Sequence, residues 1–162
     1  MAIEQTDLSG AEDVHVDVFH CASMHGTHEQ QRHVIGRLES LVERGTVDRV
    51  QRQAWAHELM PEADDDWCEE ARATYSRFWT WAREHDRTLE PGFGTRTVSS
   101  MISDDSYEVI TFPVLCIAVY ADGTLVEVAP STDAESNTTY TVSECLDDLE
   151  NSVSAQHARA RT

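Results

Sequence analysis

The stretch FPVLCIAVYADGTLVEV, residues 112–128, decides the fold. Apolar and β-branched residues fill both of its halves, and Asp122 and Gly123 stand between them. Both residues tolerate the positive φ angles of a two-residue turn, so the stretch predicts an antiparallel β-hairpin. Its apolar run, residues 112–120, is too short to cross a bilayer, which takes roughly 20 residues. We therefore expect no membrane-spanning segment.

Further strands and a last helix are predicted on either side of the hairpin. Residues 94–101 and the run 107–120 have the composition of strands. Tyr140 and Val142 follow a polar loop, and Ser143 can cap a helix that continues to about residue 150.

The N-terminal half predicts a strand and two helices. Alternation of Val14, Val16 and Val18 with polar residues indicates a strand over residues 14–19. Apolar residues at helical spacing predict a helix over about 28–44, which Gly45 ends, since glycine adopts the left-handed conformation freely. Residues 47–59 look extended, and a second helix is predicted over about 65–85.

This order of elements predicts a single α+β domain with an antiparallel or mixed sheet and helices on one face. A ferredoxin-like split β-α-β arrangement is the first topology that we expect, and a winged-helix-like domain is the alternative. We place the domain at residues 13–150, between a flexible acidic N-terminus, residues 1–12, and a flexible C-terminal tail, residues 151–162.

The charge of the chain predicts a halophilic protein. Its 30 acidic residues outnumber 12 basic ones, all of them arginine, and leave a formal net charge of −18. Molar salt shortens the Debye length to about 3 Å and screens this repulsion. The composition therefore indicates a haloarchaeal-type cytoplasm.

The cysteines agree with this location. Four are spread along the chain without a CxxC pair, at positions 21, 68, 116 and 145, and no secretory signal precedes them. We expect reduced thiols and a cytoplasmic protein.

The segment RLESLVERGTVDRV, residues 37–50, resembles the recognition-helix end and wing entry of winged helix-turn-helix proteins. This resemblance implies a DNA-reading helix. A simple link from a helix to a strand is the other interpretation of the same residues.

A second resemblance covers more of the chain. The blocks FPVLCIAVYADG, residues 112–123, and YTVSECLDDL, residues 140–149, together with residues 16–21, resemble a haloarchaeal family of unknown function whose members are labelled helix-turn-helix proteins. The label implies transcriptional regulation.

Arginines cluster in a way that is compatible with DNA binding. Residues 27–57 hold five arginines against four acidic residues in a strongly acidic chain. Guanidinium groups match guanine edges and phosphates. The candidate nucleic-acid-binding residues are Arg32, Arg37, Arg44, Arg49 and Arg52; solvated helix faces are the alternative interpretation.

A second cluster of side chains has metal-binding chemistry. Imidazoles and a thiol gather at His20, Cys21, His25 and His28. Zinc takes such nitrogen and sulfur ligands, but the spacing matches no closed zinc pattern, so a surface or capping role is the alternative.

Trp79 and Trp81 cannot share one narrow helix face, because residues two apart diverge by roughly 200°. We expect at least one of them at an edge or interface, in a homodimer or with another cytosolic protein.

No nucleophile motif or nucleotide fingerprint is present, so we expect no enzyme. The chain is predicted to be a cytosolic regulatory protein that binds DNA through the arginine-bearing helix and following strand. The alternative is a protein-interaction or small-ligand-sensing module without DNA binding.

Overall fold

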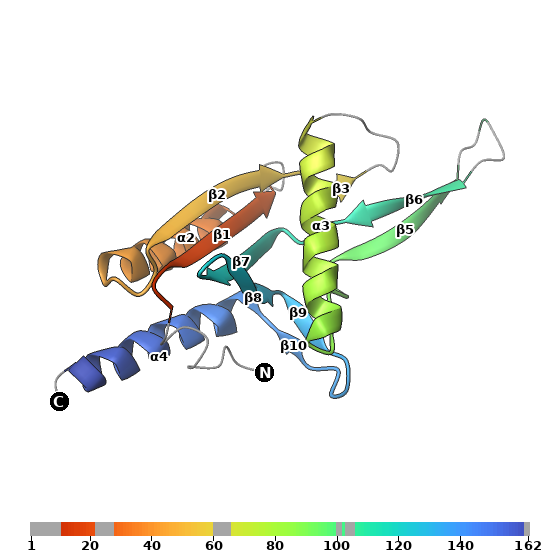
Figure 1. Cartoon of the computed structure of the whole chain (residues 1–162). Coiled ribbons are helices and arrows are strands. Elements are labelled where there is room, and N and C mark those ends of the chain that lie inside the picture. Colours follow the sequence, from red (N-terminus) through yellow and green to blue (C-terminus); the bar gives the residue numbers. More distant parts are fainter. Residues whose placement is uncertain (1–10, 22–27, 60–65, 100–101, 103–105, 161–162) are drawn as a thin grey trace.

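The computed structural model describes residues 11–21, 28–59, 66–99, 102 and 106–160, which form an α+β fold as predicted (Figure 1). The predicted N-terminal tail, residues 1–12, lies largely outside this range. The elements in chain order are β1 (Val14–Cys21), α2 (His28–Glu43), β2 (Arg49–Trp55), β3 (Glu58–Leu59), α3 (Asp66–Glu84), β4 (Arg87–Thr88), β5 (Gly94–Ser99), β6 (Ser106–Thr111), β7 (Leu115–Ala121), β8 (Thr124–Ala129), β9 (Ser131–Asp133), β10 (Thr139–Tyr140) and α4 (Val142–Ala160).

The largest sheet is mixed and has the order β2-β1-β7-β8. β1 pairs in parallel with β2 and antiparallel with β7, and β7 pairs antiparallel with β8. Smaller sheets have the orders β10-β9-β4 and β3-β6-β5, and the β5–β6 hairpin projects from the body of the molecule (Figure 1).

The ferredoxin-like split β-α-β arrangement is wrong, because β2 lies directly beside β1. Asp48 fixes this pairing at its first residues. The Asp48 backbone N–H donates to the Val14 carbonyl oxygen at 2.8 Å, and the Asp48 carboxylate accepts the Val14 backbone N–H at 2.7 Å. No room is left for a strand between β1 and β2.

Helices cover both faces of the large sheet, so the prediction of helices on one face is also wrong. Val16 and Val18 of β1 pack under α2 and α4, whereas Phe19 and Cys21 of the same strand pack under α3. The physical reason is that β7 is apolar on both faces and that Phe19 and Cys21 extend the second apolar face onto β1, so both faces of the sheet need cover.

The predicted end of the first helix is confirmed. Gly45 has φ 80°, its N–H donates to the Val42 carbonyl oxygen at 3.1 Å, and the Thr46 N–H donates to the Leu41 carbonyl oxygen at 3.0 Å. These two bonds form a Schellman motif, which satisfies carbonyls that the end of a helix leaves free. The chain then turns directly into β2.

The predicted hairpin is confirmed as β7 and β8. Asp122 and Gly123 adopt φ 51° and 82°. The Asp122 carboxylate also accepts the backbone N–H groups of Glu12 and Asp13, each at 2.9 Å. The turn therefore anchors the start of β1 as well.

The C-terminal part differs from the prediction in detail. The loop after Pro130 contains the short strand β9, and Thr141 rather than Ser143 caps α4, since its hydroxyl accepts the Glu144 N–H at 3.1 Å. α4 continues through Ala160, past the predicted domain end; flexibility of residues 151–162 stays a prediction.

The winged-helix alternative does not match the described chain, in which β1 precedes α2 and strands separate α2 from α3. No helix in the described ranges has the length and apolar character needed to cross a membrane.

We expect Leu38→Ala to lower the free energy of unfolding by about 2–5 kcal/mol, because the fully buried Leu38 side chain fills the core between α2 and the sheet. Val42→Ala is the matched control on the same helix, since Val42 is 36% exposed. Denaturant titration in molar KCl measures both. Equal losses in the two variants would contradict the burial of this helix face.

Candidate functional site

The candidate arginines on α2 and at its end differ in their surroundings. Arg32 and Arg44 are exposed and have no ion-pair partner among the described residues. Arg37 instead bridges to α4, with Nη2 2.6 Å from Asp147 Oδ1 and Nε 2.9 Å from Glu150 Oε1. Its hydrogen bond to Glu150 raises the pKa of Arg37. Arg37 thus holds α2 against α4, and a phosphate would compete there with two carboxylates.

β2 is an edge strand, and residues 50–54 are exposed or partly exposed. Arg49 and Arg52 are three positions apart, so their side chains point to opposite faces of the sheet. Arg49 pairs in register with His15 on the face that carries α3, and Arg52 pairs with Val18 on the face that carries α2. Arg49 also lies 3.8 Å from the exposed Asp13, a weak ion pair.

We call Arg49, Gln51, Arg52 and Gln53 the β2 edge surface. All four side chains are exposed. Residues 49–56 contain two arginines and no acidic residue, although the whole chain carries a net charge of −18. The structure therefore joins two of the predicted arginines to two glutamines in one basic, acid-free strand.

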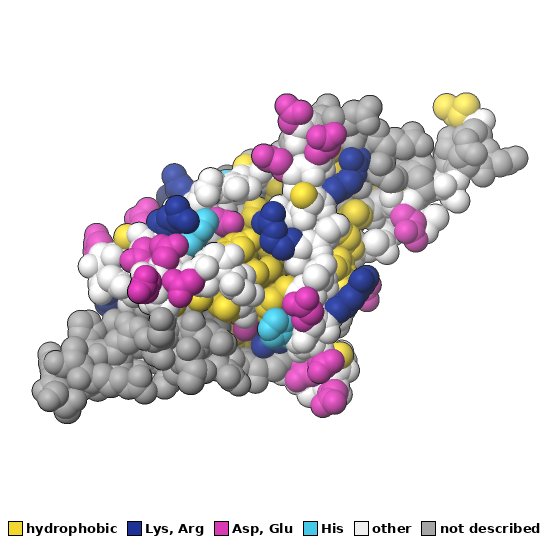
Figure 2. Space-filling view, viewed as in Figure 1, with side chains coloured by type: hydrophobic (Ala, Val, Ile, Leu, Met, Phe, Trp, Pro, Cys, Tyr) yellow, Lys and Arg dark blue, Asp and Glu magenta, His cyan; other side chains and the backbone are white. Residues whose placement is uncertain are grey.

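The face of the sheet beside α3 is only partly covered. Arg77 of α3 donates from Nη1 to the Tyr120 hydroxyl at 3.2 Å, and His15 stacks on Tyr120. Near the end of β2, a cavity of about 250 Å³ separates strand from helix, lined by Phe19, Gln53, Ala54, Trp55, Glu70, Ala71 and Thr74. Figure 2 views this face, with arginines (dark blue) over β2 and beside α3 and apolar side chains (yellow) between them.

The predicted metal ligands His20 and Cys21 do not converge. They are consecutive on β1 and therefore point to opposite faces of the sheet. The Cys21 side chain is buried, and burial raises its pKa. His25 lies outside the described residues, and only the backbone of His28 is described. The part of the chain that the structure describes holds no cluster of three or more metal-ligating side chains.

The two tryptophans lie in different environments, as their spacing predicts. Trp81 is 3% exposed and belongs to the core under α3, so it is not an interface residue. Trp79 is half-buried and lines a shallow hollow with Tyr75 and Arg83. An interface role for Trp79 stays a prediction.

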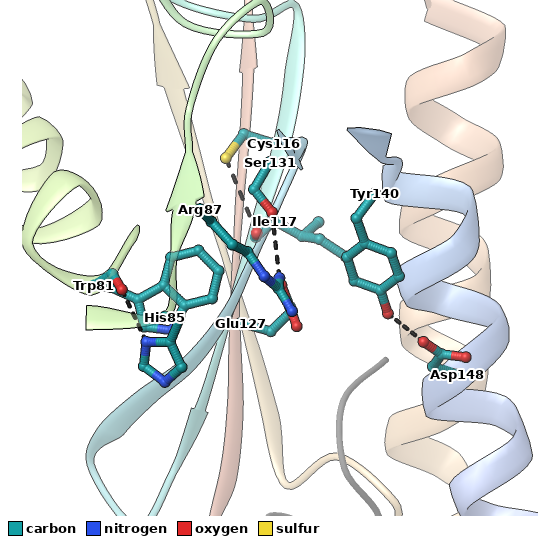
Figure 3. Close-up of polar contacts among 9 residues, drawn as sticks. All are labelled: Trp81, His85, Arg87, Cys116, Ile117, Glu127, Ser131, Tyr140 and Asp148. Carbon is teal, nitrogen blue, oxygen red and sulfur yellow. Dashed lines mark hydrogen bonds and ion pairs between the residues drawn. The ribbon is translucent and has the colours of Figure 1, made fainter. Parts of the chain in front are cut away.

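A buried polar cluster, which the sequence analysis did not identify, connects the two cores (Figure 3). Arg87 forms an ion pair with Glu127, and both side chains are nearly buried. The Arg87 guanidinium lies 5.1 Å from the Trp81 ring and 5.7 Å from the Tyr140 ring, so two aromatic faces stabilise its charge. Tyr140 donates its hydroxyl to Asp148 of α4. The cluster therefore links α3, the strands and α4.

Burial governs the protonation of this cluster. It raises the pKa of Glu127 to about 7, although the neighbouring Arg87 acts in the opposite direction. Burial also raises the pKa values of Tyr140 and Cys145. The phenol and the thiol stay protonated at neutral pH, while Glu127 changes its charge there.

One sequence signal points to this cluster. Glu127 interrupts the otherwise apolar end of β8 and is flanked by Val126 and Val128. An acid in such a strand needs a buried partner. Arg87 is 40 residues distant in sequence, so local pattern alone does not identify it as that partner.

We expect Glu127→Gln to remove a pH-dependent contribution to stability. Because the pKa of Glu127 rises from 4.5 to about 7 on folding, the folded state holds its proton more tightly. The contribution of this raised pKa to the free energy of unfolding is fully present below pH 4.5 and is lost as the pH rises through about 7. The free energy of unfolding of the native protein, relative to the variant, should fall by up to about 3 kcal/mol over this window.

Denaturant titrations across the pH range measure this difference. Glu135→Gln, in an exposed loop, controls for the loss of one acid. If the free energies of unfolding of the native protein and Glu127→Gln differ by a constant amount across the pH range, the raised pKa of Glu127 is contradicted.

The comparisons with known proteins identify a family. A helix-turn-helix domain family matches residues 8–154, nearly the whole chain. No curated protein and no solved structure matches. In the described chain, strands β2 and β3 separate α2 from α3, so these helices are not joined by a short turn. The resemblance seen in the sequence is confirmed at the level of the family: the chain belongs to the helix-turn-helix domain family.

Proposed function

We propose that this protein is a DNA-binding transcription regulator of a haloarchaeal-type cytoplasm and that it contacts DNA through the α2–β2 region. Family membership supports a DNA-binding regulatory role. The observation that carries the location is the β2 edge surface, an exposed strand without acids in a chain of net charge −18. A polyanion meets less repulsion at such a surface than over the acidic segments of the chain.

Three arginines are the proposed phosphate contacts. Arg32 and Arg44 are exposed on α2 and just after it, and Arg52 extends from β2 on the same face of the sheet. None of the three has an ion-pair partner among the described residues, so no described acid competes with a phosphate for them. Arg37 contributes through the packing of α2 on α4 instead.

The high salt concentration of such a cytoplasm weakens these phosphate contacts. Each neutralised phosphate lowers log affinity by about 0.9 per unit of log salt, so phosphate contacts lose much of their strength in molar KCl. Specific binding there needs contacts to bases as well, and arginine and glutamine both make them. The β2 edge surface supplies both residue types.

We expect Arg52→Ala to weaken binding to all DNA sequences alike and to reduce the salt dependence of log affinity by about 0.9. The triple variant at Arg32, Arg44 and Arg52 should reduce it by up to about 3. Fluorescence anisotropy with duplex DNA over a range of KCl concentrations measures the slope. Arg83→Ala removes the same charge from the exposed side of α3 and should leave the slope unchanged.

Chromatin immunoprecipitation of a tagged copy from cells in native salt tests the regulatory role. Discrete enriched sites that disappear in the triple variant are the expected result. A flat profile for the unaltered protein would contradict DNA binding and favour a protein-interaction or ligand-sensing module. An equal slope change in Arg83→Ala would contradict the location.

A further inference from the structure

One row of side chains on β2 has a geometry suited to reading a sequence. Arg49, Gln51 and Gln53 alternate along the strand and share one face, since they pair in register with His15, Asp17 and Phe19 of β1. All three are exposed. The buried Trp55 ends the row and packs against Phe19 at a ring-centroid distance of 4.6 Å.

The row is accessible because α3 does not close over it. α3 packs against the far side of this face, where Cys116 and Ala118 of β7 lie in the core beneath it. Between α3 and the end of β2 remains the cavity of about 250 Å³ bordered by Gln53 and Thr74. β2 itself is at the edge of the sheet, so its outer side has no neighbouring strand.

The spacing and chemistry of the row match a duplex. Alternate residues of a strand are about 6.6 Å apart, close to two base steps of 3.4 Å. In the major groove, arginine recognises guanine and glutamine recognises adenine, each through two hydrogen bonds. Three such side chains in line can therefore contact successive positions along a groove.

The row carries one arginine and no acid, and the neighbouring acids lie on β1, before it and on α3. Asp17, the acid nearest to Gln51 in the register, is 9% exposed and lies beside the His15 ring, and Asp13 lies 3.8 Å from Arg49. Glu70 borders the cavity at the end of the strand, which Gln53 also lines. Arg52 projects from the opposite face of β2.

We infer that β2, rather than a helix, is the element that reads the DNA sequence, with Arg49, Gln51 and Gln53 as its specificity-determining residues. This inference rests on the proposed DNA-binding function. It assigns affinity and specificity to different side chains. Arg32, Arg44 and Arg52 set the strength of binding to any sequence, whereas the row decides which sequence is preferred.

Selection from a random-sequence duplex library in molar KCl tests the assignment. For Gln51→Ala and Gln53→Ala we expect discrimination at one base position each to fall by roughly 10- to 100-fold. The two affected positions should lie about two base steps apart. Affinity for unselected DNA and its salt dependence should not change. Gln30→Ala, on the exposed side of α2, is the matched control and should keep the original preference.

The possible results distinguish a wrong assignment of the reading strand from a wrong assignment of DNA binding. If the native protein selects a sequence and both glutamine variants select the same one, β2 is not the reading element, but DNA binding stands. If the native protein retains no DNA, the proposed function fails and the inference fails with it. If the variants alter self-association in sedimentation but not DNA selection, the row is a protein interface. Thermal unfolding confirms that each variant is folded.

Discussion

The direct parallel pairing of β1 with β2 is the constraint on which the rest of the structure depends. The hydrogen bonds between Val14 and Asp48 start this pairing in one register. The pairing places β1 inside the sheet, where both of its faces are buried, and β2 at the edge. α2 must then cover one face, while α3 covers part of the other. The exposed edge strand and the partly open face both follow from this arrangement.

A second constraint holds the layers together. The ion pair of Arg87 and Glu127 lies between the two cores, and Tyr140 extends the cluster to Asp148 on α4. α4 is in turn tied to α2 through Arg37. Breaking a buried pair by removing one partner leaves an uncompensated charge, which is more costly than losing an exposed pair. These charged side chains therefore add specific contacts between helices that the two apolar cores hold against the sheet.

Local patterns in the sequence predict most of the elements but not their arrangement. Alternation identified β1, helical spacing identified α2 and α3, and the Asp122–Gly123 turn identified the hairpin, because each signal lies within a few residues. The pairing of β1 with β2 and the helix-covered second face were not predicted, because they depend on contacts between distant residues.

In the candidate site, too, local patterns identified individual residues but not the contacts between distant ones. The sequence pointed to Arg49 and Arg52, but not to the opposite faces on which they lie or to the glutamines between them. It also grouped Arg37 with them, whereas the ion pairs to Asp147 and Glu150 are visible only once α4 is placed. The Arg87–Glu127 pair had no local signal for its partner. Long-range pairing thus decides which charged residues are available to a ligand.

We propose that this member of the helix-turn-helix domain family meets DNA at its edge strand β2. Hydrogen–deuterium exchange in molar KCl, with and without sheared genomic DNA, tests it directly. We expect slower exchange in peptides from residues 49–55 when DNA is present and unchanged exchange in residues 79–84 of α3. Protection confined to α3 or α4, or no protection anywhere, would contradict it.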